Sequence, residues 1–317
     1  MNYAPALIIV YNRLNHFKQC IESLMRNIGA DQTDLFIAID APYRQEDRND
    51  VESIYAYSKS ITGFKSITIF MRDKNLGPRE NLLSAVTDIY TMHDEIILSE
   101  DDNIFSVDFL EYMNQSLSFY RSRKDIVAIC GYNYPVTLPK EYRGDVFAWT
   151  GFSAWGYGIW KDRWYEIDRE PPIQELKNFL HNKKINKELD AIAGIYKPHL
   201  ENIINSGHYS DDTILCYNLF KNKKYCIFPT VSHVRNIGHD GSGIHCGNDI
   251  HGKFLNQQIS DGTKTIKLEY DIEPDVTVNY TLYKYFKISK LAPIKRVVIR
   301  LIHYNLWRDR VKLRGRT

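Results

Sequence analysis

The sequence predicts an α/β protein in which a mostly parallel sheet is flanked by helices. Through the first 130 residues, short aliphatic runs alternate with longer segments whose apolar residues recur at helical spacing. This order is typical of parallel sheets, because each right-handed crossover returns the chain to the same edge of the sheet. Several of the aliphatic runs also end directly in polar or acidic residues. Functional side chains are therefore expected at the carboxyl ends of the strands.

The first-half elements follow in order along the chain. Aliphatic or alternating runs of strand length predict strands at 6–10, 35–39, 66–70, 95–98 and 126–129. Helical spacing of apolar residues predicts helices at about 14–25, 47–60, 77–90 and 107–120.

The composition changes from Trp149 onward. Residues 149–160 are rich in glycine and aromatic residues, which predicts a ligand-facing loop. A polar helical region is expected at 173–205, an apolar helix at about 214–220, and a short strand at 226–229. Residues 233–251 are rich in Gly, His and Asn and predict a mobile loop.

The overall composition indicates a soluble globular protein. The chain has 317 residues, 44% of them hydrophobic and 25% charged, which suits one large domain with an appendage or two small domains. A net charge of +2 argues against nucleic acid as a partner. The five cysteines have no metal-ligand spacing and favour buried thiols in a reducing compartment. With neither a signal peptide nor a membrane-spanning stretch in the sequence, we expect a cytoplasmic location.

Three successive acids, Glu100, Asp101 and Asp102, follow the aliphatic run at 95–98. Three carboxylates at one point repel one another, and they become favourable when a divalent cation shares the site. Ligands that are all oxygen suit Mn²⁺ or Mg²⁺. The alternative is a solvated turn before a helix, in which Asp101 or Asp102 serves as the N-cap.

A second acidic pair, Asp211 and Asp212, precedes the apolar helix at 214–220. One of these carboxylates could act as a general base that takes a proton from an attacking hydroxyl group. The alternative is helix capping by Ser210 or Asp211, with acids favoured in the first turn by the helix dipole. The two roles can coexist, and the sequence does not decide which aspartate would be the base.

Four histidines, at 233, 239, 245 and 251, fall within one predicted loop, at spacings that match no standard zinc site. The loop also contains Gly238, Gly241, Gly243 and Gly247. These glycines favour a loop that can close over a phosphorylated ligand.

These features occur in the same order in one family of enzymes. Leu7-Ile-Ile-Val-Tyr-Asn-Arg13, the acidic triplet, the Gly/Trp stretch and the later acidic pair resemble inverting GT-A-fold glycosyltransferases. The resemblance covers roughly residues 5–245 and is to the N-acetylglucosaminyltransferase I-like group and bacterial family 2 sugar transferases. It implies metal-dependent transfer from a nucleotide-diphospho sugar, with a UDP-sugar favoured, to a glycan hydroxyl in bacterial surface polysaccharide synthesis.

The resemblance also implies roles for individual residues. The nucleotide sugar would contact the ends of the first strands through Tyr11, Asn12, Arg13, Asp40, Lys74 and Asn75. Asp102 would ligate the metal, while Glu100 and Asp101 would touch the ribose and the donor sugar. Trp155 and Gly156 would line the donor and acceptor sites, and Asp212 or Asp211 would be the catalytic base. The family more often has a tryptophan beside this acidic pair, where this chain has Tyr209, Ser210 and Thr213.

The same reasoning predicts the domain organisation. Residues 1–245 would form the GT-A catalytic domain, with a nucleotide-sugar half at about 1–130 and an acceptor half at about 131–245. Residues 246–275 would be a flexible loop region, and 276–317 a basic amphipathic extension with helical spacing. Such a helix suits peripheral contact with the anionic inner face of the cell membrane and a lipid-linked acceptor. The alternative is a helix docked on the catalytic domain or on another subunit.

Two other functions remain open at the level of sequence. A nucleotidyltransferase acting on sugar phosphates also uses acids at such a sheet edge, but it would carry a glycine-rich basic loop after the first strand. This chain has Tyr11-Asn-Arg-Leu-Asn-His16 at that place. A non-catalytic carbohydrate-binding protein is the other alternative, and it leaves the two separated acidic sites unexplained.

Overall fold

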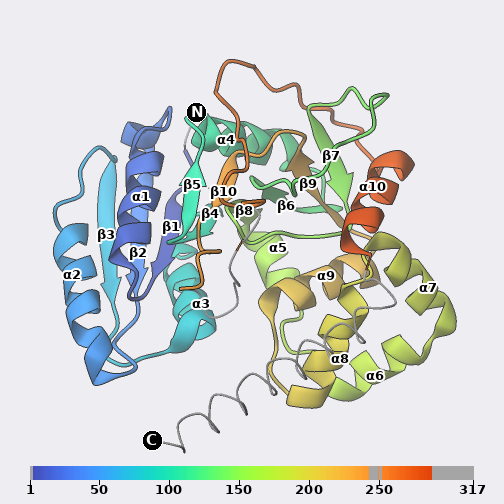
Figure 1. Cartoon of the computed structure of the whole chain (residues 1–317), viewed down its shortest axis with the longest axis horizontal. Coiled ribbons are helices and arrows are strands. Elements are labelled where there is room, and N and C mark those ends of the chain that lie inside the picture. The colour runs from blue at the N-terminus through green and yellow to red at the C-terminus, as the bar shows by residue number, and fades with distance from the viewer. Residues whose placement is uncertain (1–2, 243–248, 250–251, 288–317) are drawn as a thin grey trace, which may run out of the picture.

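A computed structural model describes residues 3–242, 249 and 252–287 of the chain. Its centre is an eight-stranded sheet with the order β3-β2-β1-β4-β8-β6-β9-β7 (Figure 1). Six strands run in one direction and only β8 and β7 oppose them. The predicted α/β class with a mostly parallel sheet is therefore confirmed. In sheet order the strands are Ser66–Met71, Asp34–Ile39, Ala6–Val10, Glu95–Glu100, Tyr157–Trp160, Ile126–Cys130, Tyr225–Pro229 and Val146–Trp149.

Strand β1 lies between β2 and β4, and the chain order changes direction there. The chain leaves β1 for β2 and β3 on one side and then returns to β4 on the other side. Ile9 is opposite Glu100, while Val10 is opposite Ile39. In open α/β sheets, ligands bind outside the carboxyl ends of the strands at such a switch point.

Helices cover both faces of the sheet and produce two apolar cores (Figure 1). Helices α1 (Leu14–Met25), α2 (Arg48–Ser58) and α4 (Phe109–Tyr120) pack on one face. Helices α3 (Gly77–Ile89) and α5 (Lys161–Glu166) pack on the other face. Short 3₁₀ turns, η1 at Ala30–Gln32 and η2 at Gln45–Asp47, precede β2 and α2.

The polar helical region predicted at 173–205 consists of three helices beside α9, gathered on one side of the molecule (Figure 1). The region is divided because Asn182 ends α6 and also caps α7 by accepting hydrogen bonds from two backbone N–H groups. Gly207, with a φ of 72°, ends α8 in the left-handed conformation. The bounds are α6 Ile173–His181, α7 Lys183–Ile192, α8 Tyr196–Ser206 and α9 Asp211–Lys221.

The glycine- and aromatic-rich stretch at 149–160 is a loop only in its middle. Trp149 ends β7, and Tyr157–Trp160 form β8, which lies antiparallel between β4 and β6. The loop prediction is therefore wrong for these strand residues. Their pairing partners are about 30 and 60 residues away in the chain, so the local glycine content gave no indication of the strand. Likewise β10 (Val234–Asn236), within the predicted mobile loop, pairs with β5 (Asn103–Phe105).

The C-terminal part of the described chain packs against the sheet. Residues 252–275 contain no helix or named strand, but the Tyr120 hydroxyl donates to the Glu269 carbonyl at 2.9 Å and Ile272 is buried. Helix α10 (Val276–Phe286) then begins at Asp275, whose side chain accepts two backbone N–H groups. The rest of the predicted basic extension lies outside the described residues, and the domain boundaries stay predictions. Of the helices in the described ranges, none has the length and hydropathy needed to cross a membrane.

Candidate active site

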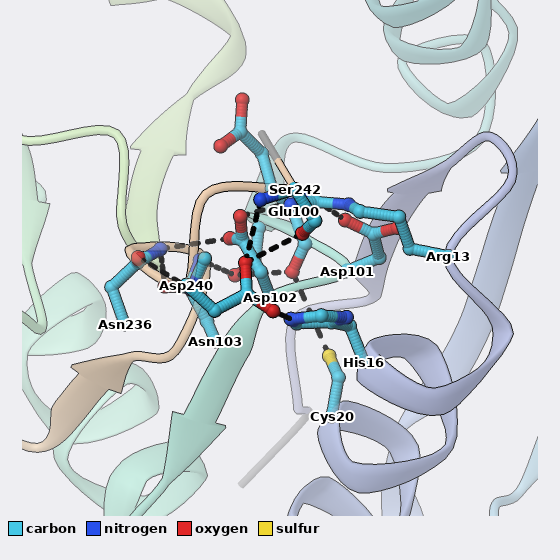
Figure 2. A network of polar contacts seen from close by, with 12 residues as sticks. Arg13, His16, Cys20, Glu100, Asp101, Asp102, Asn103, Asn236, Asp240 and Ser242 are labelled. Atoms are coloured by element: carbon cyan, nitrogen blue, oxygen red, sulfur yellow. Dashed lines mark hydrogen bonds and ion pairs between the residues drawn. The ribbon is translucent and has the colours of Figure 1, made fainter. Parts of the chain in front are cut away.

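The acidic triplet lies at the carboxyl end of β4, beside the end of β1 (Figure 2). Asp101 and Asp102 are each 4% exposed, whereas Glu100 is exposed. Strand β5 follows directly, so neither aspartate is a helix N-cap and the alternative of a solvated cap is wrong. Burying two adjacent carboxylates is unfavourable unless something compensates their charge.

Arg13 supplies part of that compensation (Figure 2). Its Nη2 atom donates to Asp101 Oδ1 and, at 2.9 Å, to Asp102 Oδ2. Burial alone would lower the pKa of Arg13, but the two aspartates hold that pKa above its usual value. One guanidinium stands against three carboxyl groups, so a net negative charge remains if all three ionise.

The pKa values of the acids are raised, as expected where negative charge exceeds positive charge. Burial raises the pKa of Asp101 to about 7, and Asp102 adds to the rise while Arg13 opposes it. Desolvation by the surrounding protein raises the pKa of Glu100 to about 8, although part of the side chain is exposed to solvent. The charges of Asp102 and Asp212 contribute to this rise, which identifies Asp212 as an electrostatic neighbour of the triplet.

The segment after β10 lies directly on the triplet (Figure 2). Asn236 Nδ2 donates to Asp102 Oδ1 at 2.8 Å, and the Ile237 N–H donates to the Asp102 carbonyl at 2.8 Å. Gly238 approaches so closely that a Cβ atom there would overlap Asp102 Oδ2. His16 Nε2 lies 3.2 Å from Asp240 Oδ2 and ties the same segment to α1.

Tyr11 and Asn12, at the end of β1, both contact Asp47. The Tyr11 hydroxyl donates to Asp47 Oδ2 at 2.8 Å, and Asn12 Nδ2 donates to Oδ1 at 3.0 Å. The hydroxyl also accepts the Tyr43 N–H at 2.7 Å. These contacts fix the loop between β2 and α2, and Asn12 is not the cap of α1 because Arg13 holds that position.

Asp40, at the end of β2, anchors the start of α3. Its carboxylate accepts hydrogen bonds from Asn75 Nδ2 and from three backbone N–H groups, those of Ala41, Leu76 and Gly77, at 2.8 to 3.1 Å. Two donors on each oxygen occupy its lone pairs. The predicted contacts of Asp40 and Asn75 with a nucleotide stay predictions, and here the two residues bind one another. Lys74 beside them is exposed.

The second acidic pair forms the first turn of α9, and its two members differ. Asp211 Oδ1 lies 3.5 Å from Arg79 Nε and 3.8 Å from Arg169 Nη1. For Asp212 no hydrogen bond or ion pair occurs within the described residues. Desolvation by the surrounding protein and the charge of Asp211 raise the pKa of Asp212 to about 6, although part of the side chain is exposed to solvent. Ser210 holds the N-cap position without a capping hydrogen bond from its side chain.

Trp155 and Gly156 lie in the loop before β8, beside the segment that covers the triplet. The Trp155 ring meets the rings of Tyr132 and His239 edge-on, with centroids 4.6 and 5.4 Å apart. Gly156 has a φ of 70°, and its carbonyl accepts the Gly131 N–H at 2.7 Å. His239 directly follows Gly238, so the aromatic residues adjoin the acidic site.

The predicted histidine loop does not form a metal centre in the described residues, where no group of three or more His, Cys, Asp or Glu side chains could hold an ion. His233 is buried and its Nδ1 contacts Ser106 Oγ at 3.0 Å and Asp108 Oδ1 at 3.1 Å. Asp108 Oδ2 accepts a 2.7 Å hydrogen bond from Ser260, so this cluster joins α4 to the C-terminal segment. His245 and His251 lie outside the described residues.

The three acids of the triplet do not converge on one point, so a divalent cation here would use a single protein carboxylate, that of Asp102. Each Asp102 oxygen receives one hydrogen bond, from Asn236 or from Arg13, and so retains a lone pair. The excess negative charge and the all-oxygen ligands match Mn²⁺ or Mg²⁺, with water or phosphate completing the coordination.

Sequence reasoning missed several residues of this site. Asn236 and Gly238 contact Asp102, Asp47 holds the end of β1, and Arg79 with Arg169 pairs Asp211. Only the Asn-Ile-Gly run of the predicted loop offered a signal. The others are ordinary helix or loop residues whose partners lie far along the chain.

Comparisons with known proteins give distant similarities only. No protein-family model and no curated protein matches this chain. Among solved structures, S. aureus TarS is 12% identical, with 45% of this chain and 23% of that chain covered and a TM-score of 0.31. TarS 1–349 gives 10% identity, coverages of 50% and 47%, and a TM-score of 0.34. The mannosyltransferase PcManGT from Pyrobaculum calidifontis, in complex with GDP-Man and Mn²⁺, is 9% identical to this chain. The alignment covers 69% of each chain, with a TM-score of 0.40.

The aligned part of this chain spans less than a quarter of TarS and less than half of TarS 1–349. These TM-scores are low, so the similarities carry no evidence about function.

Proposed function

We propose that this protein is a metal-dependent inverting glycosyltransferase that moves a sugar from a nucleotide-diphospho sugar to a hydroxyl group of a glycan acceptor. The observation that carries the proposal is the convergence of two acidic sites at one edge of the sheet. Glu100 is the last residue of β4, and Asp212 lies in the first turn of α9 more than 100 residues later, yet the charge of Asp212 raises the pKa of Glu100. Such a pair of sites can serve the two ends of a displacement reaction.

Asp212 is the residue best suited to act as the general base. The acceptor oxygen forms a bond to the anomeric carbon as the bond from that carbon to the diphosphate breaks, and the hydroxyl proton passes to the carboxylate. A pKa of about 6 keeps Asp212 ionised at neutral pH while making it more basic than an ordinary aspartate. Asp211 is less suitable because Arg79 and Arg169 stand against its Oδ1 atom. A base on the face opposite the leaving group gives inversion.

The triplet is the proposed diphosphate end of the site. Asp102 would hold the cation, with Asp101 and Glu100 beside it, and Asn236 and Arg13 orient the Asp102 carboxylate. When bound, a divalent cation supplies charge neutralisation for the leaving diphosphate. Tyr11, Asn12, Asp40 and Asn75 shape the adjacent edge through internal hydrogen bonds. The exposed Lys74 and Glu100 remain open to a ligand. A UDP-sugar donor is favoured by the family resemblance, and a role in surface polysaccharide synthesis belongs to the same proposal.

Donor hydrolysis tests the proposal without knowledge of the acceptor. The protein is incubated with UDP-, GDP- and other nucleotide sugars, with Mn²⁺ or with chelator, and the release of nucleoside diphosphate is measured. We expect slow, metal-dependent release from one donor, unchanged in Asp190→Asn, where an exposed aspartate of α7 serves as the control.

Release of pyrophosphate from a nucleoside triphosphate and a sugar 1-phosphate would instead indicate a nucleotidyltransferase. Glycan binding without turnover of any donor would indicate a carbohydrate-binding protein.

A further inference from the structure

Helix α10 lies at the edge of the molecule (Figure 1), and large side chains on the side of the helix away from the core are exposed. Its inward residues, Val278 and Leu282, are fully buried in the core. On its outward side Val276 is 81% exposed and Tyr280 is 56% exposed. Large apolar side chains so exposed at neighbouring positions of one helix indicate a contact surface rather than packing within the domain.

Lysines accompany these aromatic residues. The rings of Tyr280 and Tyr283 stack with centroids 6.2 Å apart, Lys284 Nζ lies 4.2 Å from the Tyr280 centroid, and Lys287 Nζ lies 5.8 Å from that of Tyr283. No acidic residue occurs between Val276 and Phe286. Tyrosine rings and lysine stems are amphipathic, and both are enriched where an apolar layer meets charged headgroups.

The charge of the chain is divided sharply at the end of α10. Residues 288–317 contain nine Lys and Arg residues and one acid, Asp309. Since the whole chain has a net charge of +2, residues 1–287 carry a net charge of −6. A net negative charge on residues 1–287 is repelled by an anionic surface, so attraction to such a surface has to come from local positive charge such as the lysines of α10 and the basic sequence after it.

We propose that the outer face of α10, defined by Val276, Tyr280, Tyr283 and Lys284, docks on an anionic lipid bilayer. The tyrosines enter the headgroup boundary, and the basic residues supply long-range attraction. The bilayer matches both properties of this surface, since the aromatic face needs an apolar boundary and the positive charge needs an anionic one. The proposal does not depend on the sugar-transfer chemistry.

Co-sedimentation of the full-length chain with vesicles tests the proposal. We expect binding to phosphatidylcholine vesicles that contain phosphatidylglycerol, little binding to phosphatidylcholine alone, and release at high salt. The double variant Tyr280→Glu/Tyr283→Glu should bind roughly twenty-five-fold more weakly, because each charge near the surface changes binding by about fivefold. Tyr165→Glu, on α5 and 58% exposed in the wild type, is the matched control and should bind normally.

A thermal melt shows whether the double variant is folded, and Tyr280→Ser/Tyr283→Ser replaces it if it is not. Wild-type vesicle binding by the folded variant would overturn the proposal. A change in the oligomeric mass of the variant would also overturn it, because that outcome would assign the face to contact with a second copy of the chain. A lowered melting temperature with unchanged vesicle binding would assign the face to packing within the chain itself.

Discussion

Replacing Asp212 by Asn tests the assignment of the base most directly, because the substitution keeps the shape of the side chain and removes its charge. The structure predicts opposite effects on catalysis and on stability. Transfer should slow by roughly a hundredfold or more, the usual scale for a lost general base. Donor binding should be nearly unchanged, since the triplet at the end of β4 is left intact.

The effect on stability follows from the sign of the pKa shift. The folded protein raises the pKa of Asp212 to about 6, above its ordinary value, so ionisation is less favourable in the folded state than in the unfolded state. The wild type therefore loses stability as the pH rises from about 4 to about 6. A rise in pKa from about 4 to about 6 corresponds to about 3 kcal/mol. Because the side chain is exposed, solvent screening reduces this to about 1 kcal/mol.

The assay compares the wild type and Asp212→Asn by thermal melts at pH 4 and pH 8 and by a pH–rate profile. We expect the variant to be the more stable protein at pH 8 and equal to the wild type below pH 4. Wild-type activity should rise as the pH passes through about 6, and this limb should be missing in the variant. Normal turnover by the variant, or a larger loss in Asp211→Asn, would refute the assignment.

Four further substitutions probe the site and the neighbouring cluster of Asp108 and His233. Asp211→Asn should slow transfer less than Asp212→Asn, but it should lower the melting temperature because Arg79 loses a partner. Asp102→Ala should abolish Mn²⁺-dependent nucleotide binding measured by calorimetry, while circular dichroism should show that the fold is retained. A wild-type nucleotide affinity in this variant would show that Asp102 does not bind the metal. Gly238→Ala should weaken the same binding, because its Cβ atom would displace the segment that covers Asp102, while Ser242→Ala should not. Asp108→Asn should destabilise the protein by about 2 kcal/mol at neutral pH. Hydrogen bonds outweigh burial and hold the pKa of Asp108 low, so this loss should shrink as the pH falls below about 4.

The sequence by itself determined the parallel half of the sheet and the place of the acidic triplet. The strands β1, β2, β4 and β6 are aliphatic runs buried on both faces, a local pattern that admits few other structures. Once these strands were predicted, the carboxyl end of β4 followed, and with it the position of Glu100–Asp102.

Tertiary structure alone decided which of these groups act together. Strand β8 is inserted between β4 and β6 by backbone pairing, and β10 brings Asn236 and Gly238 onto Asp102. Asp211 and Asp212 are identical neighbours in the sequence, and only the position of Arg79 and Arg169 distinguishes them. The reason is physical: strand and helix periodicity are local properties of a chain. Pairing partners, counter-ions and pKa values depend on groups that folding brings together from positions far apart.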